Sequence, residues 1–510
     1  MSSVIKNEFK IEEKYNHFAR SGKMKVLIFD VDSLRPDHLG AYGYHRNTSP
    51  NIDKIAAKGV RFTEYYTSDA PCLPSRTALA TGKMGIRSGL INHGGEASRL
   101  RISEQNLDFK DDLSKYSLAG IFRQKGLETV LISTFPERHS AWHFSAGWNK
   151  VINNGKLGDE IASDVNRDAM NWLKENGSND DWCLYVNYWD PHTPYRTPED
   201  YGEPFEDDPI PEWLTEEKLK KDRELVGPHS AREVDMYWNA PLEQYPRHVS
   251  EIKNMHDMAK LINGYDTGIR YMDDHIGEII DELKRQGIED EVAIIITADH
   301  GENLGELGIY AEHGTADKYT CNIPMIIKFP GAKQGIVDDN LHYSLDLLPT
   351  LADLLEVESS PDWDGESFAE TIRAGKDTGR DYLVISQNAH VCQRSVRFKD
   401  WLYIRTYHDG YHLFDKHQLY NLKENPHEQY NVAKQYPNVV KEAVANLNDW
   451  HDEMMSKMNE PHDPMWTVLG EGGPFHANGH LEMYINERLL PTGRTKAAEK
   501  LRERHPQEFK

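Results

Sequence analysis

KVLIFDVD, residues 25–32, is the stretch that most clearly indicates the fold class of this chain. It is a nearly continuous apolar run that ends in an acid, a pattern typical of a strand buried on both faces with Asp32 at its carboxyl end. EVAIIITADH, residues 291–300, repeats the pattern and ends in Asp299 and His300. Open α/β sheets bind ligands at the carboxyl ends of their strands, so we expect these three side chains to lie together. Two carboxylates and one imidazole around an open position suit a hard divalent cation, Ca²⁺, Mg²⁺ or Mn²⁺.

Strands and helices alternate along the N-terminal two thirds of the chain. Apolar runs predict further strands at 129–133, 182–188 and 324–329, and helical spacing predicts helices at 164–175 and 262–286 between them. This alternation indicates an α/β fold over residues 24–370, with a mostly parallel sheet sandwiched by helices.

Three regions depart from this alternation. Residues 199–251 are rich in Pro, acidic residues and Trp with broken periodicity, which indicates an insertion at the rim of the sheet. Residues 371–460 carry short aromatic alternations and then one amphipathic helical pattern, so we expect a smaller subdomain with a short antiparallel sheet and a helix. Residues 461–510 form a tail, either a surface arm or a segment that covers the active site or a neighbouring subunit.

Composition limits the class of protein. Acidic residues outnumber basic ones by 83 to 59 and the formal net charge is −24, which argues against a nucleic-acid partner. Met1 to Lys23 lacks the apolar run of a secretory signal and no stretch approaches membrane length, so we expect a cytoplasmic protein without a membrane partner. Four cysteines without metal-type pairing are by default buried thiols: Cys72, Cys183, Cys321 and Cys392.

One of these cysteines stands at a distinctive place. The run from Ala70 to Leu79 leads from a polar loop into a helix and sets Cys72 near the helix N-terminus, where free N–H groups favour an anion. An unmodified Cys72 is therefore expected to be a thiolate with a low pKa. Arg76, one turn on, is expected to hold the oxygen at position 72 and to offset developing charge.

An ordered set of motifs runs through the chain. They are VDSLRPD (31–37), CLPSR followed by TG (72–82), DPHTPY (190–195), DHGE (299–302) and LYNL (419–422). With these motifs the chain resembles the type I sulfatases of the alkaline phosphatase superfamily from about Val26 to Asn421. The resemblance implies an alkaline-phosphatase-like fold and a sulfuric ester hydrolase. It also implies oxidation of the motif cysteine to formylglycine by a formylglycine-generating (sulfatase-maturing) enzyme.

The resemblance further assigns roles to single residues. Asp32, Asp299, His300 and the modified Cys72 bind one divalent metal, and His192 contacts the leaving sulfate ester. The hydrate of the aldehyde attacks sulfur, and its second hydroxyl then expels sulfate by C–O cleavage, which a serine ester could not do.

The metal site departs from the family pattern at one position. Ser33 follows Asp32 where many relatives have a second acid. Water, Ser33 or Asp30 could take that ligand position, so the metal's identity stays open, with Ca²⁺ favoured over Mg²⁺ and Mn²⁺.

A second departure lies after the strand at 129–133. STFPERHS, residues 133–140, stands where the family usually has a Gly-Lys-Trp-His element. Arg138 or His139 could supply the positive charge and the proton that the Lys and His of that element provide, or both could belong to a plain surface loop.

Further pocket candidates follow from position. His313, in Glu312-His313-Gly314, fills the spacing at which many relatives place a Lys near the sulfate. We interpret it as the leaving-group acid or a sulfate contact, because histidine can donate a proton near neutral pH. Asn92 and His93 are possible substrate-binding residues.

Three functions are open at this point. The first is a sulfatase acting on a sulfated sugar, such as a glycosaminoglycan-derived saccharide, in an exo-type pocket with Trp213, Tyr237 and Trp238 as a stacking wall. The second is a phosphonate or phosphate ester hydrolase of the same superfamily. The third is a non-catalytic glycan-binding relative in which Cys72 stays a thiol. The oligomeric state is not determined by the sequence.

Overall fold

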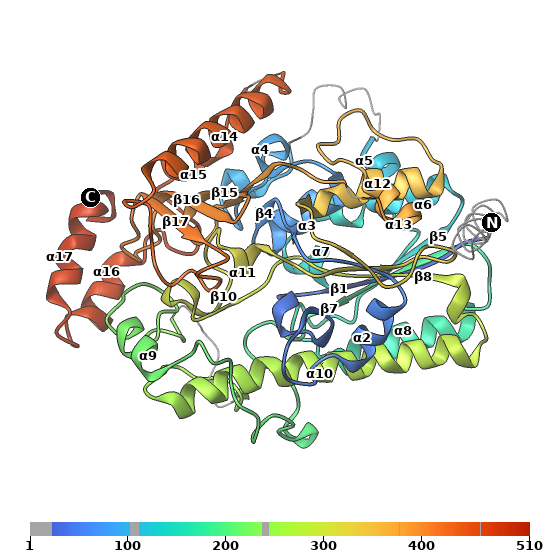
Figure 1. The fold of residues 1–510 in the computed structure, drawn as a ribbon, viewed down its shortest axis with the longest axis horizontal. Helices are drawn as coiled ribbons and strands as arrows, with labels where there is room; N and C mark the ends of the chain where they lie inside the picture. The colour runs from blue at the N-terminus through green and yellow to red at the C-terminus, as the bar shows by residue number, and fades with distance from the viewer. Residues whose placement is uncertain (1–22, 102–111, 237–243, 377, 460, 510) are drawn as a thin grey trace.

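A computed structural model describes residues 23–101, 112–236, 244–376, 378–459 and 461–509 (Figure 1). Its centre is an eight-stranded sheet in the order β12-β2-β11-β8-β1-β7-β5-β6, in which β11 alone runs against the others. The bounds are β1 (Lys25–Val31), β2 (Val60–Phe62), β5 (Glu128–Ile132), β6 (Lys150–Ile152), β7 (Trp182–Tyr188), β8 (Val292–Ala298), β11 (Met325–Lys328) and β12 (Ile336–Asp338). The predicted mostly parallel sheet is confirmed.

Strand β1 occupies the middle of this sheet because, apart from Lys25 and Asp30, its residues are apolar on both faces. All seven are buried, and the strand pairs in parallel with β7 on one side and β8 on the other. In register, Val31 lies opposite Tyr188 and Ala298. The residues that directly follow these strands therefore emerge side by side at one edge of the sheet.

Helices cover both faces of the sheet, as Figure 1 shows. One face carries α10 (Met255–Arg285), α8 (Ala162–Asn176) and α2 (Pro50–Ala57), which pack on one another. The other carries α3 (Cys72–Thr81), α6 (Leu118–Gln124) and α12 (Leu347–Leu355). Helix α10 begins seven residues before the predicted start, because the Asn254 side chain accepts the N–H groups of His256 and Asp257 and so caps it at Met255.

Short elements connect these layers. They are β3 (Tyr65–Tyr66), α4 (Gly85–Ser88), α5 (Asp112–Tyr116), α7 (Phe135–Arg138), α9 (Glu216–Asp222), β9 (Asn303–Leu304), β10 (Tyr310–Glu312), α11 (Lys318–Cys321), β13 (His342–Tyr343) and α13 (Ala369–Ala374).

A second sheet has the order β17-β16-β15-β14-β4. Its antiparallel strands are β14 (Tyr382–Gln387), β15 (Cys392–Phe398), β16 (Trp401–His408) and β17 (His417–Asn421), and α14 (Pro437–Ser456) packs against it. The predicted small sheet with a helix is confirmed. Its fifth strand, β4 (Asp69–Ala70), pairs in parallel with β14 and comes from the segment just before Cys72. The C-terminal sheet thereby helps to hold the start of α3.

The tail folds back onto the molecule. It forms α15 (Pro464–Gly470), α16 (Leu481–Tyr484), a π-helical turn (Ile485–Leu489) and α17 (Thr495–Arg504). Arg394 donates two hydrogen bonds of 2.8 Å to Asp463, and Arg504 pairs with Asp409 at 2.6 Å. Tail side chains also share a buried cluster with Val226 and Met236. The interpretation as a surface arm is therefore wrong.

The insertion offers less to a substrate than expected. Trp213 stacks on His427 with 4.0 Å between ring centroids, and His427 in turn stacks on Tyr319 at 5.0 Å. One face of the indole is thus covered from within the protein, which does not support the expected stacking wall, while Tyr237 and Trp238 lie outside the described residues. None of the helices in the described ranges combines the length and apolar composition that crossing a membrane requires.

Candidate active site

Two carboxylates stand at the carboxyl ends of neighbouring strands. Asp32 follows β1 and Asp299 follows β8, and both are buried. Between them, Ser33 adopts a left-handed backbone with φ of 59°. This conformation lets the Ser33 N–H donate to Asp299 Oδ1 at 3.2 Å while the hydroxyl donates to Asp32 Oδ1 at 3.0 Å. Ser33 therefore positions both carboxylates.

Arg76 is bound to three carboxylates at once. Its Nε donates to Asp30 at 2.8 Å, and its Nη1 donates to Asp32 at 2.9 Å and to Asp299 at 2.7 Å. All four side chains are fully buried. We expected Arg76 to hold the oxygen at position 72, but only Nη2 is left without a partner for that purpose. Asp30 Oδ2 accepts from Arg76 and from the Tyr185 hydroxyl, whereas Asp30 Oδ1 is buried without a partner. Asp30 is not one of the four residues whose ligand atoms converge.

Cys72 and His300 complete a group of four convergent donors with Asp32 and Asp299. One ligand atom from each of the four lies within 4.8 Å of the others, and the Cys72 Sγ is 3.1 Å from His300 Nε2. His300 Nδ1 faces the Gly301 carbonyl at 2.8 Å, so Nδ1 carries the proton and Nε2 presents a lone pair. The structure brings together the four residues to which the sequence assigned the metal.

The charge of this group fits a divalent cation. Three buried carboxylates face one guanidinium, which leaves excess negative charge at the centre. Burial raises the pKa of Asp299 to about 7, although the charge of Arg76 acts in the opposite direction. Burial also acts to raise the pKa of Asp32, but His192 and Arg76 lower it by more, so that it lies below the ordinary value. Carboxylate oxygens with one imidazole are a hard donor set, and binding a cation there would release protons.

The Cys72 thiol does not behave as the helix position suggested. Cys72 is the first residue of α3 and is 3% exposed. Burial raises the pKa of the thiol well above its ordinary value, and the charges of Asp32 and Asp299 raise it further. The expectation of a low-pKa thiolate is therefore wrong, because buried carboxylates outweigh a helix terminus.

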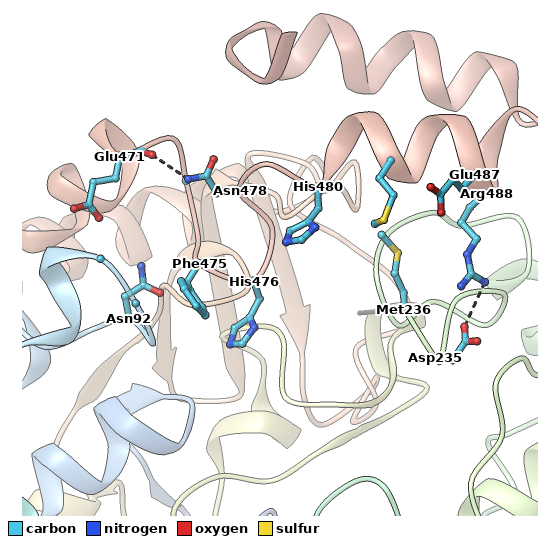
Figure 2. A pocket seen from close by; sticks show the side chains of 14 residues that line it. Asn92, Asp235, Met236, Glu471, Phe475, His476, Asn478, His480, Glu487 and Arg488 are labelled. Carbon is cyan, nitrogen blue, oxygen red and sulfur yellow. Dashed lines mark hydrogen bonds and ion pairs between the residues drawn. The ribbon is translucent and has the colours of Figure 1, made fainter. Parts of the chain in front are cut away.

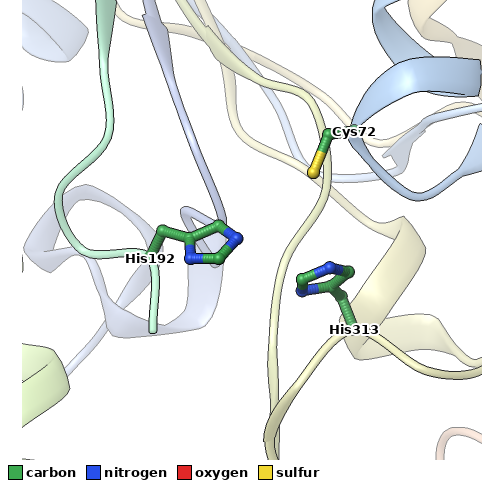
Figure 3. A group of neighbouring side chains, drawn as sticks. All are labelled: Cys72, His192 and His313. Atoms are coloured by element: carbon green, nitrogen blue, oxygen red, sulfur yellow. The ribbon is translucent and has the colours of Figure 1, made fainter. Parts of the chain in front are cut away.

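Two histidines face the cysteine from other loops. Figure 3 shows Cys72, His192 and His313 pointing into one common space, and a ligand atom of each lies within 4.8 Å of the others. His192 Nε2 is 3.9 Å from Asp32 Oδ1, and the His313 ring stacks on His300 at 4.2 Å. Burial lowers the pKa of His192 to about 3 and that of His313 well below its ordinary value.

These pKa shifts correct the argument for His313. A neutral imidazole at pH 7 offers an N–H and a lone pair but holds no extra proton to donate. The Glu312 carboxylate accepts the backbone N–H of His313 at 2.8 Å, while the ring nitrogen Nδ1, 3.1 Å from the same oxygen, makes no hydrogen bond. The structure therefore favours a sulfate contact for His313 over an acid that is charged before substrate binds.

The other candidate residues come from the loops that hold His93 and His139. The His139 ring lies 5.3 Å from that of His93, and burial, with Arg138 and Arg76, lowers the pKa of His139 to about 3. Arg138 is exposed, lies over the Trp189 ring at 5.0 Å and donates to a backbone carbonyl. Asn92 is buried and its side-chain oxygen accepts the His93 N–H. The catalytic and binding roles of these side chains stay predictions.

Sequence reasoning missed two histidines of this wall. His390 follows β14, and its ring lies 5.4 Å from His313. His476 comes from the tail, stacks on His390 at 4.2 Å and shares a hydrogen bond of 2.9 Å with His93 Nδ1. Neither lies in a recognisable motif, and the Gly-Gly-Pro turn before His476 was the one local signal of a defined loop.

A cavity of about 750 Å³ opens beyond this wall. Figure 2 shows Asn92 and His476 among its lining residues, with the tail residues Glu471 and Glu487 on opposite sides of it. Most of the residues that line this cavity come from the tail.

Comparison with known proteins decides the family. A model of the sulfatase family matches residues 25–357, and a model of the C-terminal part of N-sulphoglucosamine sulphohydrolase matches residues 305–454. The chain belongs to the sulfatase family. This sulfatase is accordingly a sulfuric ester hydrolase, and the family implies a formylglycine and a bound metal at its centre.

Several relatives share most of its length. It is 26% identical over 453 residues to a choline-sulfatase of Rhizobium meliloti, covering 81% of this chain and 83% of that protein. It is 22% identical to an N-acetylglucosamine-6-O-sulfatase of Bacteroides thetaiotaomicron, covering 88% and 89%. A solved structure in complex with its substrate D-glucosamine-2-N,6-O-disulfate matches with a TM-score of 0.67 at 20% identity, covering 86% of this chain and 99% of that one.

Proposed function

We propose that this sulfatase hydrolyses a sulfate ester on a sulfated sugar, with Cys72 converted to formylglycine and Ca²⁺ as the metal. The observation that carries the proposal is the convergence of Asp32, Cys72, Asp299 and His300 on one buried point. The sugar is supported by the relatives named for N-acetylglucosamine-6-O-sulfate and hexuronate-2-O-sulfate esters, and by the match to a sulphoglucosamine sulphohydrolase. A sulfated saccharide and a maturing enzyme are the partners we propose, in the cytoplasm.

The two implied groups would supply defined chemistry. The cation, held by Asp32, Asp299, His300 and the oxygen at position 72, supplies positive charge against the sulfate oxygens. The hydrated aldehyde supplies a nucleophile and a second hydroxyl through which sulfate can leave by C–O cleavage.

The chain's own residues prepare the centre for this reaction. Arg76 neutralises part of the charge on the three carboxylates, which keeps Asp32 and Asp299 close enough together to act as ligands. His192 and His313 face the side chain of residue 72, and burial keeps their rings neutral. They can therefore bind the sulfate oxygens or the bridging oxygen of a substrate through their N–H groups. Arg138, at the exposed rim, adds the positive charge that guides the anion inward.

Mass spectrometry and a substrate panel test the proposal together. The tryptic peptide from Phe62 to Arg76 is expected to carry an aldehyde in place of the Cys72 thiol, and the protein is expected to hydrolyse aryl sulfates and monosulfated sugars. Cys72→Ala is expected to lose this turnover while its unfolding curve stays within about 1 kcal/mol of the native protein. A preference for phosphonate or phosphate esters would overturn the sulfatase substrate. Sugar binding without turnover in the native protein would favour the non-catalytic reading.

A further inference from the structure

A second group of metal-type donors lies next to the centre around Cys72. It consists of Glu312, His313 and His390, and one ligand atom of each lies within 4.8 Å of the other two. Glu312 ends β10, His313 follows it directly, and His390 lies in the loop after β14. The group shares no residue with the four donors that converge at Cys72.

The distances between these donor atoms match those around a tetrahedral cation. Glu312 Oε1 is 3.1 Å from His313 Nδ1 and 3.7 Å from His390 Nε2. Two ligand atoms that each lie about 2.1 Å from a tetrahedral zinc ion are about 3.4 Å apart. The two observed distances lie on either side of this value, so an ion between the three atoms requires only small shifts of the side chains.

The two ring nitrogens have no hydrogen-bond partner. His313 Nδ1 and His390 Nε2 are buried and make no hydrogen bond, although the Glu312 carboxylate lies beside both. The His313 side chain is only 7% exposed. A buried polar atom without a hydrogen bond costs about 1–3 kcal/mol, and coordination of a cation would remove this cost at both nitrogens.

The carboxylate of the group is not paired with a basic side chain of the usual kind. Within the part of the chain that the structure describes, the ion-pair partners of Glu312 are His229, His313 and His390, and none is a Lys or an Arg. Burial lowers the pKa of His313 and of His390 well below the ordinary value, so these two rings are neutral at pH 7. Neutral imidazoles are the form that binds metals, and a divalent cation would compensate the charge of Glu312.

Neighbouring groups hold the three donors in place. Gln387, buried at the end of β14, donates from Nε2 to the His313 carbonyl at 3.0 Å and accepts the His390 N–H on Oε1 at 3.1 Å. The His313 N–H donates to Glu312 Oε1 at 2.8 Å, and His229 Nε2 lies 3.1 Å from Glu312 Oε2. Contacts of this kind orient the ligands of a metal site before the ion binds.

A cavity of about 10 Å³ lies against the group. Glu312 and His390 line it, together with Gly314, which carries no side chain into this space. The volume is close to the smallest that holds one water molecule. Three protein donors leave one position of a tetrahedral ion open, and a water in this cavity can fill it.

We propose that Glu312, His313 and His390 form a second metal site, which binds a first-row transition-metal cation, with Zn²⁺ as the best fit. Two imidazoles and one carboxylate are a donor set of zinc sites that keep an open position, whereas Ca²⁺ and Mg²⁺ prefer oxygen ligands. The two neighbouring sites therefore take different metals. Bound at Nδ1, the ion fixes the ring hydrogen of His313 on Nε2, and this ring points into the space that it shares with Cys72 (Figure 3).

Metal analysis without any substrate tests the site. After dialysis against a zinc buffer in excess Ca²⁺, the native protein is expected to retain zinc in a one-to-one ratio with the chain. Glu312→Gln and His390→Gln each remove one donor at nearly constant shape. Each is expected to weaken Zn²⁺ binding by at least about 100-fold, since the loss of an outer contact alone costs 10- to 100-fold.

Two control variants separate the site from its neighbours. His412→Gln changes another histidine of the small cavity that is not one of the three donors, and it is expected to keep the zinc. Asp299→Asn removes a donor of the centre at Cys72 and is expected to keep the zinc as well. Loss of zinc in Asp299→Asn, or its retention in both Glu312→Gln and His390→Gln, would contradict the proposed site.

Cobalt gives a readout on the native protein that does not depend on the folding of any variant. Co²⁺ bound in place of Zn²⁺ is expected to show the visible absorption bands of a tetrahedral site with nitrogen and oxygen ligands. A thiolate-to-cobalt charge-transfer band would place the ion on a cysteine instead. That band, or the absence of tetrahedral bands, would overturn the proposal.

Discussion

At the scale of single residues, this active centre depends on Arg76. One guanidinium supplies three charge-assisted hydrogen bonds to Asp30, Asp32 and Asp299, all of which are buried. Removing one partner from a buried ion pair leaves the other charge uncompensated, which costs more than the pair contributes.

Arg76→Ala is therefore expected to lower the free energy of unfolding by about 3–5 kcal/mol in urea denaturation, because three carboxylates lose their counterion. Arg123→Ala, on the exposed face of α6, is the matched control and is expected to change it by less than about 0.5 kcal/mol. Equal stability of the two variants would show that the cluster is not held by Arg76.

Removal of the cation is the second prediction at this scale. A ligand present at a hundred times its Kd stabilises the folded state by about 2.7 kcal/mol, so a calcium chelator is expected to lower the free energy of unfolding by about that amount. Asp299→Asn removes one donor of the group and is expected to abolish most of the chelator's effect. Restoration by Mg²⁺ but not by Ca²⁺ would contradict the choice of metal.

At the scale of elements, α10 binds the N-terminus of α2 through one acid. Asp273 accepts the N–H groups of Asn51 and Ile52 at 2.9 Å and 2.8 Å, in the first turn of α2. Burial raises the pKa of Asp273 to about 7, against these hydrogen bonds. The folded protein therefore keeps a proton on Asp273 between its ordinary pKa of 3.8 and about 7 that the unfolded chain has lost.

Stability is expected to fall as the pH rises through this window, by about 1.4 kcal/mol per pH unit from this group, and to level off above it. Asp273→Asn is expected to remove this part of the slope when urea denaturation at pH 5 is compared with pH 7.5. Asp281→Asn, an exposed acid of the same helix, is the control and should keep the native slope. An unchanged slope in Asp273→Asn would contradict the raised pKa.

At the scale of the whole molecule, the tail and an N-terminal loop meet over the cavity. Gly94 has no side chain where the Phe475 ring packs: a Cβ built there would lie 2.1 Å from that ring. Gly470, in α15, has nothing within 4 Å of its Cβ position.

Gly94→Ala is therefore expected to displace the tail loop and to raise KM for a sugar sulfate about tenfold, equivalent to about 1.4 kcal/mol of binding, with little change in kcat. Gly470→Ala is the matched control and is expected to keep the native KM. A rise in KM for Gly470→Ala of the same size would show that the effect does not come from the contact with Phe475.

Strands whose own residues form a recognisable hydrophobic pattern could be predicted from the sequence. β1 and β8 are nearly continuous apolar runs followed by Asp32 and Asp299, and such runs are typical of the buried centre of a parallel sheet. β4 was not predictable, because two residues paired with β14, more than three hundred positions later, carry no local pattern. The start of α10 at Met255 depends on the cap by Asn254. The helical spacing of apolar residues, on which the prediction was based, does not reveal such a cap.

The family, the sheet and the identity of the central donors could be predicted, since they depend on patterns within short stretches of chain. The chemical state of those donors could not, because it follows from contacts between distant parts of the fold. The fold binds Arg76 to three carboxylates, raises the pKa of the Cys72 thiol, lowers the pKa of His192 and of His313, and brings His476 of the tail beside His93. Burial and charge at a site are set by side chains from distant segments, whose proximity no local pattern records.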